Sequence, residues 1–265
     1  MIVRSFYDTL SYMKSPVKMI VSDLDGTLLR SEKFISEYTK RILSRCREAG
    51  IKTVYATARG ASAAVLAPSE LFDGEITMNG AVARVGDEVV YKRLIPCLTA
   101  RPILLACAER GMKSSTEYGG TFYSNFNAAE LWPHMSYSKT VDLSIHDKDA
   151  EKLSILVQND DEADFIESLL PEELYMNVSS DGLAMVMHKE AAKSKAAAAL
   201  ARMWGIEQAE IAAFGDELND IDMLSYAGTG VAMANALCEV KAIAGCTCMS
   251  NDEDGVAAWL EENVL

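Results

Sequence analysis

Two aspartates that follow an apolar run are the residues of this chain best placed to do chemistry. Asp23 and Asp25 lie two positions apart near the end of the run from Lys18 to Leu29, and Gly26 follows them directly. Residues i and i+2 of a strand face the same side, so both carboxylates would project together from its end. Gly26 lets the backbone turn away without a Cβ clash. One carboxylate can then attack an electrophile while its neighbour transfers a proton.

Two other kinds of site also use such aspartates. A calcium-binding EF-hand loop has its Gly at position six and follows a helix. Counted from Asp23 as position one, Gly26 is at position four, and the segment follows an expected strand. A phosphorylated receiver domain is a single domain, and 265 residues is about twice the typical size of one. The aspartates therefore indicate a strand-end active site, provided that other residues complete it.

A second apolar strand also ends in polar side chains. The segment from Ile211 to Asp220 runs through a Gly into Asp216, Asn219 and Asp220. Such Asp- and Asn-rich turns cap helices in many proteins, but several oxygens at one strand end also suit a hard cation such as Mg²⁺. Two acidic strand ends in one chain favour the metal site.

Two further residues could meet an anion. Thr57 ends the strand-like segment 51–57, and its hydroxyl can bind a phosphate oxygen. Lys193 opens an Ala-rich helix, where a cation opposes the helix dipole and so suggests an anion nearby. Lys195 lies beside it, and either lysine taken alone is as well explained as part of a solvated helix face.

Together these segments resemble the haloacid dehalogenase-like phosphohydrolase superfamily, in particular its Cof-type branch with a large α/β cap. Residues 23–27 match its first motif, 56–59 the second, Lys193 the third and 215–220 the fourth. Ala58 stands where the second motif usually has Gly, and Ser194 where the third has Gly after its lysine. Counting back from Gly205 favours Lys193 over Lys195 as the third-motif lysine.

The resemblance implies a Mg²⁺-dependent phosphatase. Asp23, the backbone carbonyl of Asp25 and Asp216 would hold the cation, and Asp220 would orient these ligands from behind. Asp23 would form an aspartyl-phosphate while Asp25 serves as acid and then base. The phosphoryl oxygens would be bound by Thr57, Lys193 and Asn219.

The substrate implied is a phosphate monoester of a small metabolite, most simply a sugar phosphate. A sugar phosphomutase and a non-catalytic sensor of a phosphorylated ligand remain alternatives. Five polar or aromatic residues of the middle segment are candidates to meet the alcohol, although each is equally well explained as part of that segment's own core or surface: Tyr118, Tyr123, Asn125, Trp132 and His134.

The order of expected elements predicts an α/β fold. Strands at 18–29, 51–57 and 75–78 alternate with helices, which indicates a Rossmann-like parallel sheet. The regular alternation of strands and helices is lost over residues 97–187, where the expected strands include 139–145. This change predicts an inserted α+β cap domain, and the resemblance implies that it is of the C2B type. The catalytic core would then comprise residues 1–96 and 188–265.

Composition limits the partners and the location. The net charge of −14 argues against nucleic-acid binding, which needs a basic surface. No apolar run reaches the ~20 residues of a membrane span, and the first ten residues lack the apolar region of a signal peptide. We therefore expect a cytoplasmic protein, and the expected assembly is a monomer or a homodimer. Its six cysteines, without CxxC spacing, should be reduced and mostly buried.

Overall fold

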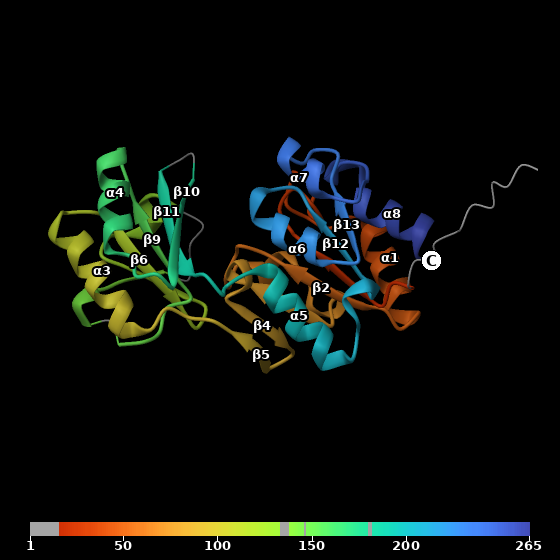
Figure 1. Ribbon diagram of the computed structural model, residues 1–265, viewed down its shortest axis with the longest axis horizontal. Helices are drawn as coiled ribbons and strands as arrows, with labels where there is room; N and C mark the ends of the chain where they lie inside the picture. The colour runs from red at the N-terminus through yellow and green to blue at the C-terminus, as the bar shows by residue number, and fades with distance from the viewer. Residues whose placement is uncertain (1–15, 133–137, 146, 180–181) are drawn as a thin grey trace, which may run out of the picture.

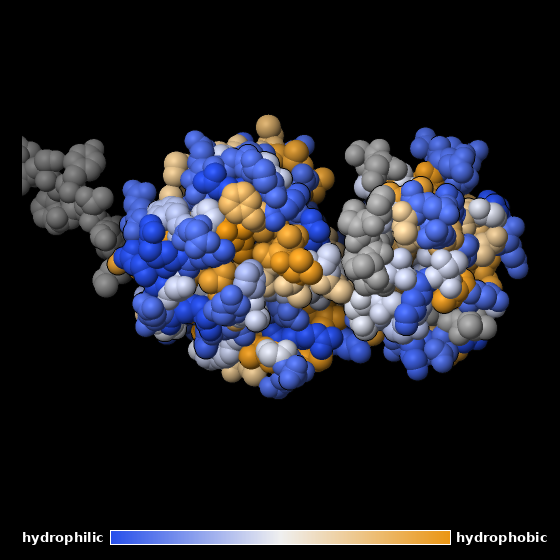
Figure 2. Space-filling view, turned by 180° about the vertical axis from the view of Figure 1, so that it is seen from behind, coloured by the Kyte–Doolittle hydropathy of each residue, from blue (hydrophilic) through white to orange (hydrophobic). Residues whose placement is uncertain are grey.

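The computed structural model of the chain describes residues 16–132, 138–145, 147–179 and 182–265. These residues form two lobes side by side, each built on its own β-sheet (Figure 1). Hydrophilic side chains cover much of both lobes, and an apolar area lies on the larger lobe near the junction (Figure 2). Within the described ranges, none of the helices combines the length and the apolar character that a membrane crossing requires.

The larger lobe contains an eight-stranded sheet in the order β14-β13-β12-β1-β2-β3-β4-β5. Neighbouring strands from β14 to β3 are parallel, and β4 and β5 form an antiparallel hairpin at the edge. All four residues of β1 are buried, as expected for a strand covered on both faces. The strands are β1 (Met19–Ser22), β2 (Lys52–Ala56), β3 (Gly74–Thr77), β4 (Val82–Val85), β5 (Glu88–Lys92), β12 (Ile211–Gly215), β13 (Thr229–Ala232) and β14 (Cys246–Thr247).

Helices pack on this sheet in pairs, α1 beside α8 and α5 beside α6 (Figure 1). Ser36 caps the first of them: the Ser36 hydroxyl accepts a hydrogen bond from the Thr39 N–H at 3.1 Å. The helices of this lobe are α1 (Glu37–Glu48), α2 (Ala63–Leu66), α5 (Lys193–Trp204), α6 (Ile221–Tyr226), α7 (Cys238–Ile243) and α8 (Gly255–Asn263).

The smaller lobe contains a six-stranded sheet in the order β10-β11-β9-β6-β7-β8, antiparallel except between β7 and β8. Helices α3 and α4 pack on it through buried Leu104, Leu153, Ile155 and Ile166. Its elements are α3 (Cys97–Glu109), β6 (Ser114–Tyr118), β7 (Thr121–Ser124), β8 (Ser138–Thr140), β9 (Lys152–Leu156), α4 (Asp160–Leu169), β10 (Leu174–Val178) and β11 (Leu183–His188).

The predicted α/β class with a Rossmann-like core is confirmed, but several element predictions were wrong. The first strand ends at Ser22, because the N–H groups of Leu28 and Leu29 turn back to the carbonyls of Asp23 and Leu24. The strand expected over 139–145 is the short β8 followed by a 3₁₀ turn at Leu143–Ile145. Strands β6 and β14 were not anticipated.

The cysteines are free, as expected, but most of them are not buried. Cys46 and Cys107 lie in the cores of the larger and smaller lobes, while Cys238 is exposed and the other three are intermediate. Burial raises the pKa of the Cys46 and Cys107 thiols to about 11, so both are protonated at neutral pH.

The division at residues 97 and 187 is a proposal that unfolding can test. Leu104 and Leu200 are fully buried in the smaller and larger lobes. Leu104→Ala should cost about 2–5 kcal/mol by leaving a cavity, and should lower the urea midpoint reported by Trp132 but not that reported by Trp259. Leu200→Ala should do the reverse.

Each midpoint is measured from the fluorescence of one tryptophan in a chain whose other two tryptophans are replaced by phenylalanine. If either substitution moves both midpoints equally, the lobes unfold as one cooperative unit and the proposed division is wrong.

Candidate active site

Three neighbouring parallel strands bring the predicted residues to one edge of the larger sheet. Strand β1 pairs with β12 on one side and with β2 on the other. Asp23, Thr57 and Asp216 each follow the last residue of one of these strands, at the carboxyl edge where open α/β sheets bind ligands. All three side chains are buried.

Lys193 is the buried cation of this edge. Its side chain has no exposed surface, and Nζ lies 2.7 Å from Asp23 Oδ1 and 2.6 Å from Asp220 Oδ1. A buried ammonium is costly unless it is paired, and two carboxylates raise its pKa despite burial. Lys195 instead pairs with Glu190 at the surface. The structure therefore places Lys193, and not Lys195, in the cluster.

Asp220 fixes the loop that follows β12. Its Oδ2 accepts hydrogen bonds from the backbone N–H groups of Asp216 at 2.9 Å and Glu217 at 3.0 Å, while Oδ1 receives Lys193. Both oxygens of Asp220 are thus engaged within the protein, so it holds other residues in place.

Thr27 is a member of the cluster to which the sequence analysis gave no role. The buried Thr27 hydroxyl donates a hydrogen bond of 2.6 Å to Asp216 Oδ1. The signal was present in the sequence, since Thr27 lies two residues after Asp25 in the same motif. The contact joins the first and the fourth motif.

Asp23 and Asp216 are the residues of this cluster that could hold a cation. Carboxylate oxygens of Asp23, Asp216 and Asp220 lie within 4.8 Å of one another. Since Asp220 is engaged and Lys193 and Thr27 each take one oxygen, Asp23 Oδ2 and Asp216 Oδ2 remain for a ligand among the described contacts. Burial raises the pKa of Asp23 to about 8, although the charge of Lys193 lowers it. Burial likewise raises the pKa of Asp216 to about 6, although the hydrogen bond from Thr27 lowers it. A hard cation would favour both ionised forms.

Asp25 is not a member of the acidic cluster and bonds to two basic side chains instead. Arg59 Nη2 lies 2.8 Å and Lys33 Nζ 2.7 Å from Asp25 Oδ1. Burial alone would raise the pKa of this carboxyl, but the bonds from Arg59 and Lys33 hold it at about 2. Its side chain is therefore a carboxylate in this arrangement. Neither basic partner had been given a role from the sequence.

The other two predicted anion-binding residues lie at the same edge. Thr57 Oγ1 accepts a hydrogen bond from the Arg59 N–H at 3.1 Å, which orients the hydroxyl. Asn219 Nδ2 donates to Asn79 Oδ1 at 2.8 Å.

Ser194, which stands where the third motif usually has Gly, lies at the start of α5. Its backbone N–H donates a hydrogen bond to Asp222 Oδ2 at 2.9 Å.

A hollow of 290 Å³ lies between the lobes next to Asp25. From the larger lobe it is lined by Asp25 and by residues 58–60, which include Ala58 and Arg59. The smaller lobe contributes an ion pair in which Lys152 Nζ lies 3.0 Å from Glu117 Oε1. Its other lining residues there are Phe122, Trp132, Ser154, Leu183 and Met185.

Of the five residues suggested to meet an alcohol, Trp132 lines this hollow. Tyr118 and Tyr123 stack on each other, with ring centroids 4.2 Å apart. Asn125 has a structural role, because its side chain bonds the Ser114 N–H and the Met112 carbonyl. His134 lies outside the described residues.

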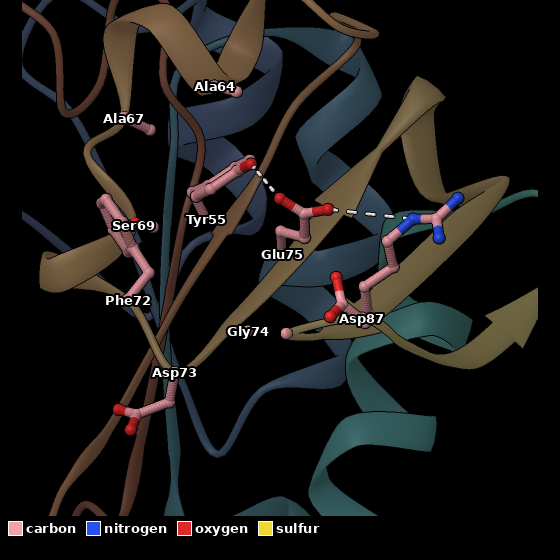
Figure 3. A pocket seen from close by; sticks show the side chains of 11 residues that line it. Tyr55, Ala64, Ala67, Ser69, Phe72, Asp73, Gly74, Glu75 and Asp87 are labelled. Atoms are coloured by element: carbon pink, nitrogen blue, oxygen red, sulfur yellow. Dashed lines mark hydrogen bonds and ion pairs between the residues drawn. The ribbon is translucent and has the colours of Figure 1, made fainter. Parts of the chain in front are cut away.

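A separate hollow of 390 Å³ lies beside β2, β3 and β4 (Figure 3). Its central polar groups are already paired: the Tyr55 hydroxyl donates to Glu75 Oε2 at 2.5 Å, and Arg84 Nε lies 3.8 Å from Glu75 Oε1. Because it contains none of the strand-end aspartates of the cluster, it is a poorer candidate for catalysis.

Comparisons with known proteins agree over nearly the whole chain. The profile of the haloacid dehalogenase-like hydrolase family matches residues 20–260. "Putative phosphatase YxeH" of Bacillus subtilis is 30% identical over 94% of this chain and 98% of its own. Among solved structures, the phosphatase BT1666 of Bacteroides thetaiotaomicron has a TM-score of 0.84 at 26% identity, over 97% of this chain and 98% of its own. The subclass IIB sugar phosphatase BT4131 has a TM-score of 0.79 at 29% identity, over 93% and 98%.

A substitution at Gly215 tests how closely the cluster is packed. A Cβ at Gly215 would overlap the side chain of Asp220, whereas one at Gly245 would make an ordinary contact with the Gly230 carbonyl at 3.7 Å. We expect Gly215→Ala to lower the free energy of unfolding by about 1–3 kcal/mol, as overpacking does, and Gly245→Ala to change it by less than about 0.5 kcal/mol. Urea unfolding of both variants measures this, and equal losses would contradict the packing described.

Proposed function

Because this chain belongs to the haloacid dehalogenase-like hydrolase family and is a phosphatase of its Cof-type branch, we propose that it hydrolyses phosphate monoesters of small metabolites, sugar phosphates foremost, with Mg²⁺. The observation that carries the proposal is the buried Lys193, which pairs with one oxygen of Asp23 in a cluster where carboxylate oxygens of Asp23, Asp216 and Asp220 lie within 4.8 Å of one another.

Asp23 is the proposed nucleophile. One of its oxygens bonds to phosphorus as the bond to the alcohol oxygen breaks, giving an aspartyl-phosphate. Water then attacks the same phosphorus, the bond to Asp23 breaks, and the carboxylate is regenerated with inorganic phosphate. When bound, Mg²⁺ would be held by Asp23, Asp216 and the Asp25 carbonyl, and would neutralise charge on the phosphoryl oxygens.

Asp25 is the proposed acid and base. In the arrangement seen here Arg59 and Lys33 keep it ionised, which suits the second step, in which it takes a proton from water. The first step needs a proton on Asp25 for the departing alcohol. A phosphate dianion near Arg59 would draw the guanidinium from Asp25 and would bring a like charge close to it, and both changes would raise the pKa of the carboxyl against the remaining bond from Lys33.

The phosphoryl oxygens are bound by Lys193, Thr57 and Asn219 in this proposal. An ammonium has three N–H donors, and Lys193 uses two of them on Asp23 and Asp220. The third is available to a phosphoryl oxygen beside the nucleophile. Preorganised donors of this kind stabilise the charge that develops in phosphoryl transfer.

The hollow between the lobes is the proposed site of the alcohol. It begins at Asp25, where the leaving oxygen must take its proton, and it offers an aromatic face at Trp132 beside the charged pair of Glu117 and Lys152. Apolar walls with a few polar groups are typical of small-molecule sites. A sugar presents both hydroxyls and a ring face to such a surface, and the similar protein BT4131 is named a sugar phosphatase.

Phosphate release tests the function directly. The protein should release phosphate from sugar phosphates and p-nitrophenyl phosphate with Mg²⁺ and not with EDTA. Sugar phosphates should give the higher kcat/KM because their hydroxyl groups can both donate hydrogen bonds to Glu117 and accept them from Lys152. Asp23→Asn should lower kcat by at least about 10³-fold in a chain that circular dichroism shows to be folded, since the carboxylate is the attacking group. Its unfolding midpoint should also fall, because Lys193 loses one of its two anionic partners.

Metal-independent release, or parental turnover by Asp23→Asn, would contradict the proposed chemistry. Accumulation of an isomeric sugar phosphate without free phosphate would identify a mutase in place of a phosphatase.

A further inference from the structure

The loop that follows β3 has an unusual backbone. Met78, Asn79 and Gly80 have consecutive positive φ angles of 50°, 50° and 95°. The left-handed region is disfavoured for a residue with a Cβ, although Asn tolerates it better than most. Two such residues in a row persist only when their surroundings hold them there.

Backbone bonds tie this loop to the second motif. The Met78 N–H donates to the Arg59 carbonyl at 3.0 Å, and the Asn79 N–H donates to the Thr57 carbonyl at 2.9 Å. The segment from Thr57 to Arg59, which carries one predicted phosphate ligand, is therefore fixed against the loop.

The loop also touches the start of α5. Gly80 packs so closely on the backbone of Ala192 and Lys193 that a Cβ at position 80 would overlap their atoms. Only glycine allows this approach, which sets the distance between the loop and the helix that carries Lys193.

The third contact of the loop is made by the Asn79 side chain. Asn79 Oδ1 accepts a hydrogen bond from Asn219 Nδ2 at 2.8 Å, and Asn79 Nδ2 lies 3.9 Å from Met187 Sδ on β11 of the smaller lobe. One amide hydrogen of Asn219 is thereby engaged, and the direction of its second hydrogen is set.

We propose that Asn79 is a positioning residue for phosphate binding, which acts by orienting the Asn219 amide. The loop of residues 78–80 lies against each segment that carries one of the three proposed phosphate ligands, Thr57, Lys193 and Asn219. Its left-handed backbone is what places Asn79 between the second and fourth motifs. This inference rests on the proposed role of Asn219 as a ligand of the phosphoryl group.

Asn79→Gly separates the side chain from the backbone, because glycine accepts a φ of +50° without strain. The variant should keep the unfolding midpoint of the parent. It should weaken the binding of inorganic phosphate, measured by calorimetric titration in the presence of Mg²⁺, by about tenfold, as the loss of one oriented hydrogen bond does. The value of kcat/KM should fall by a similar factor.

A double-mutant cycle shows whether Asn79 acts through Asn219. In the Asn219→Ala chain, adding Asn79→Gly should weaken phosphate binding by less than about twofold. A hollow of 180 Å³ is lined by Asn79, Asn177 and Asn219 among other residues. Asn177 is the matched control, because it lies at this hollow and, among the described hydrogen bonds, makes none to Asn219. Asn177→Ala should leave phosphate affinity within about twofold of the parent.

Three outcomes would count against the inference. Parental affinity in Asn79→Gly, or losses that multiply in the double variant, would overturn it while leaving the phosphatase function intact. Unchanged phosphate affinity in Asn219→Ala would remove the proposed ligand role of Asn219 and the inference with it.

Discussion

The ion pairs of Lys193 are the constraint on which the site depends. A buried ammonium must have anionic partners, and Asp23 and Asp220 supply them from two different strand ends. The start of α5 is therefore held beneath the edge where β1 and β12 end. Asp220 in turn holds the loop after β12 in place, because its second oxygen accepts hydrogen bonds from the backbone N–H groups of Asp216 and Glu217. The Lys193 ammonium thus fixes Asp23, the proposed nucleophile, and the loop that carries Asp216, the proposed metal ligand.

The two carboxylates of the first motif lie in different environments. Asp23 lies in the buried acidic cluster, where burial raises its pKa, while Asp25 lies at the hollow between the lobes with Arg59 and Lys33. Groups two residues apart can take different roles when their surroundings shift their pKa values in opposite directions. The hollow beside Asp25 then connects this chemistry to the smaller lobe, whose Glu117, Lys152 and Trp132 face the proposed alcohol.

Local sequence was enough to predict the fold class and the residues that meet at the sheet edge. Asp23, Thr57 and Asp216 were identified because each was expected near the end of a strand, and Lys193 because it starts a helix and matches the third motif of the family. The residues that contact them could not be predicted in this way, because these contacts join positions far apart in the sequence. Thr27 meets Asp216 across 189 residues, Asn219 meets Asn79 across 140, and Arg59 meets Asp25 across 34. Strand β6 was missed because Ser114, Ser115 and Thr116 are buried polar residues without apolar alternation.

The most direct test of this account is to find the residue that carries the phosphoryl group during turnover. Borohydride reduces an aspartyl-phosphate to homoserine, so the enzyme is quenched with it during turnover of a sugar phosphate and its peptides are then sequenced by mass spectrometry. The account predicts homoserine at position 23 and unmodified Asp25, Asp216 and Asp220. Phosphate release without modification of Asp23, or homoserine at another of these aspartates, would contradict it.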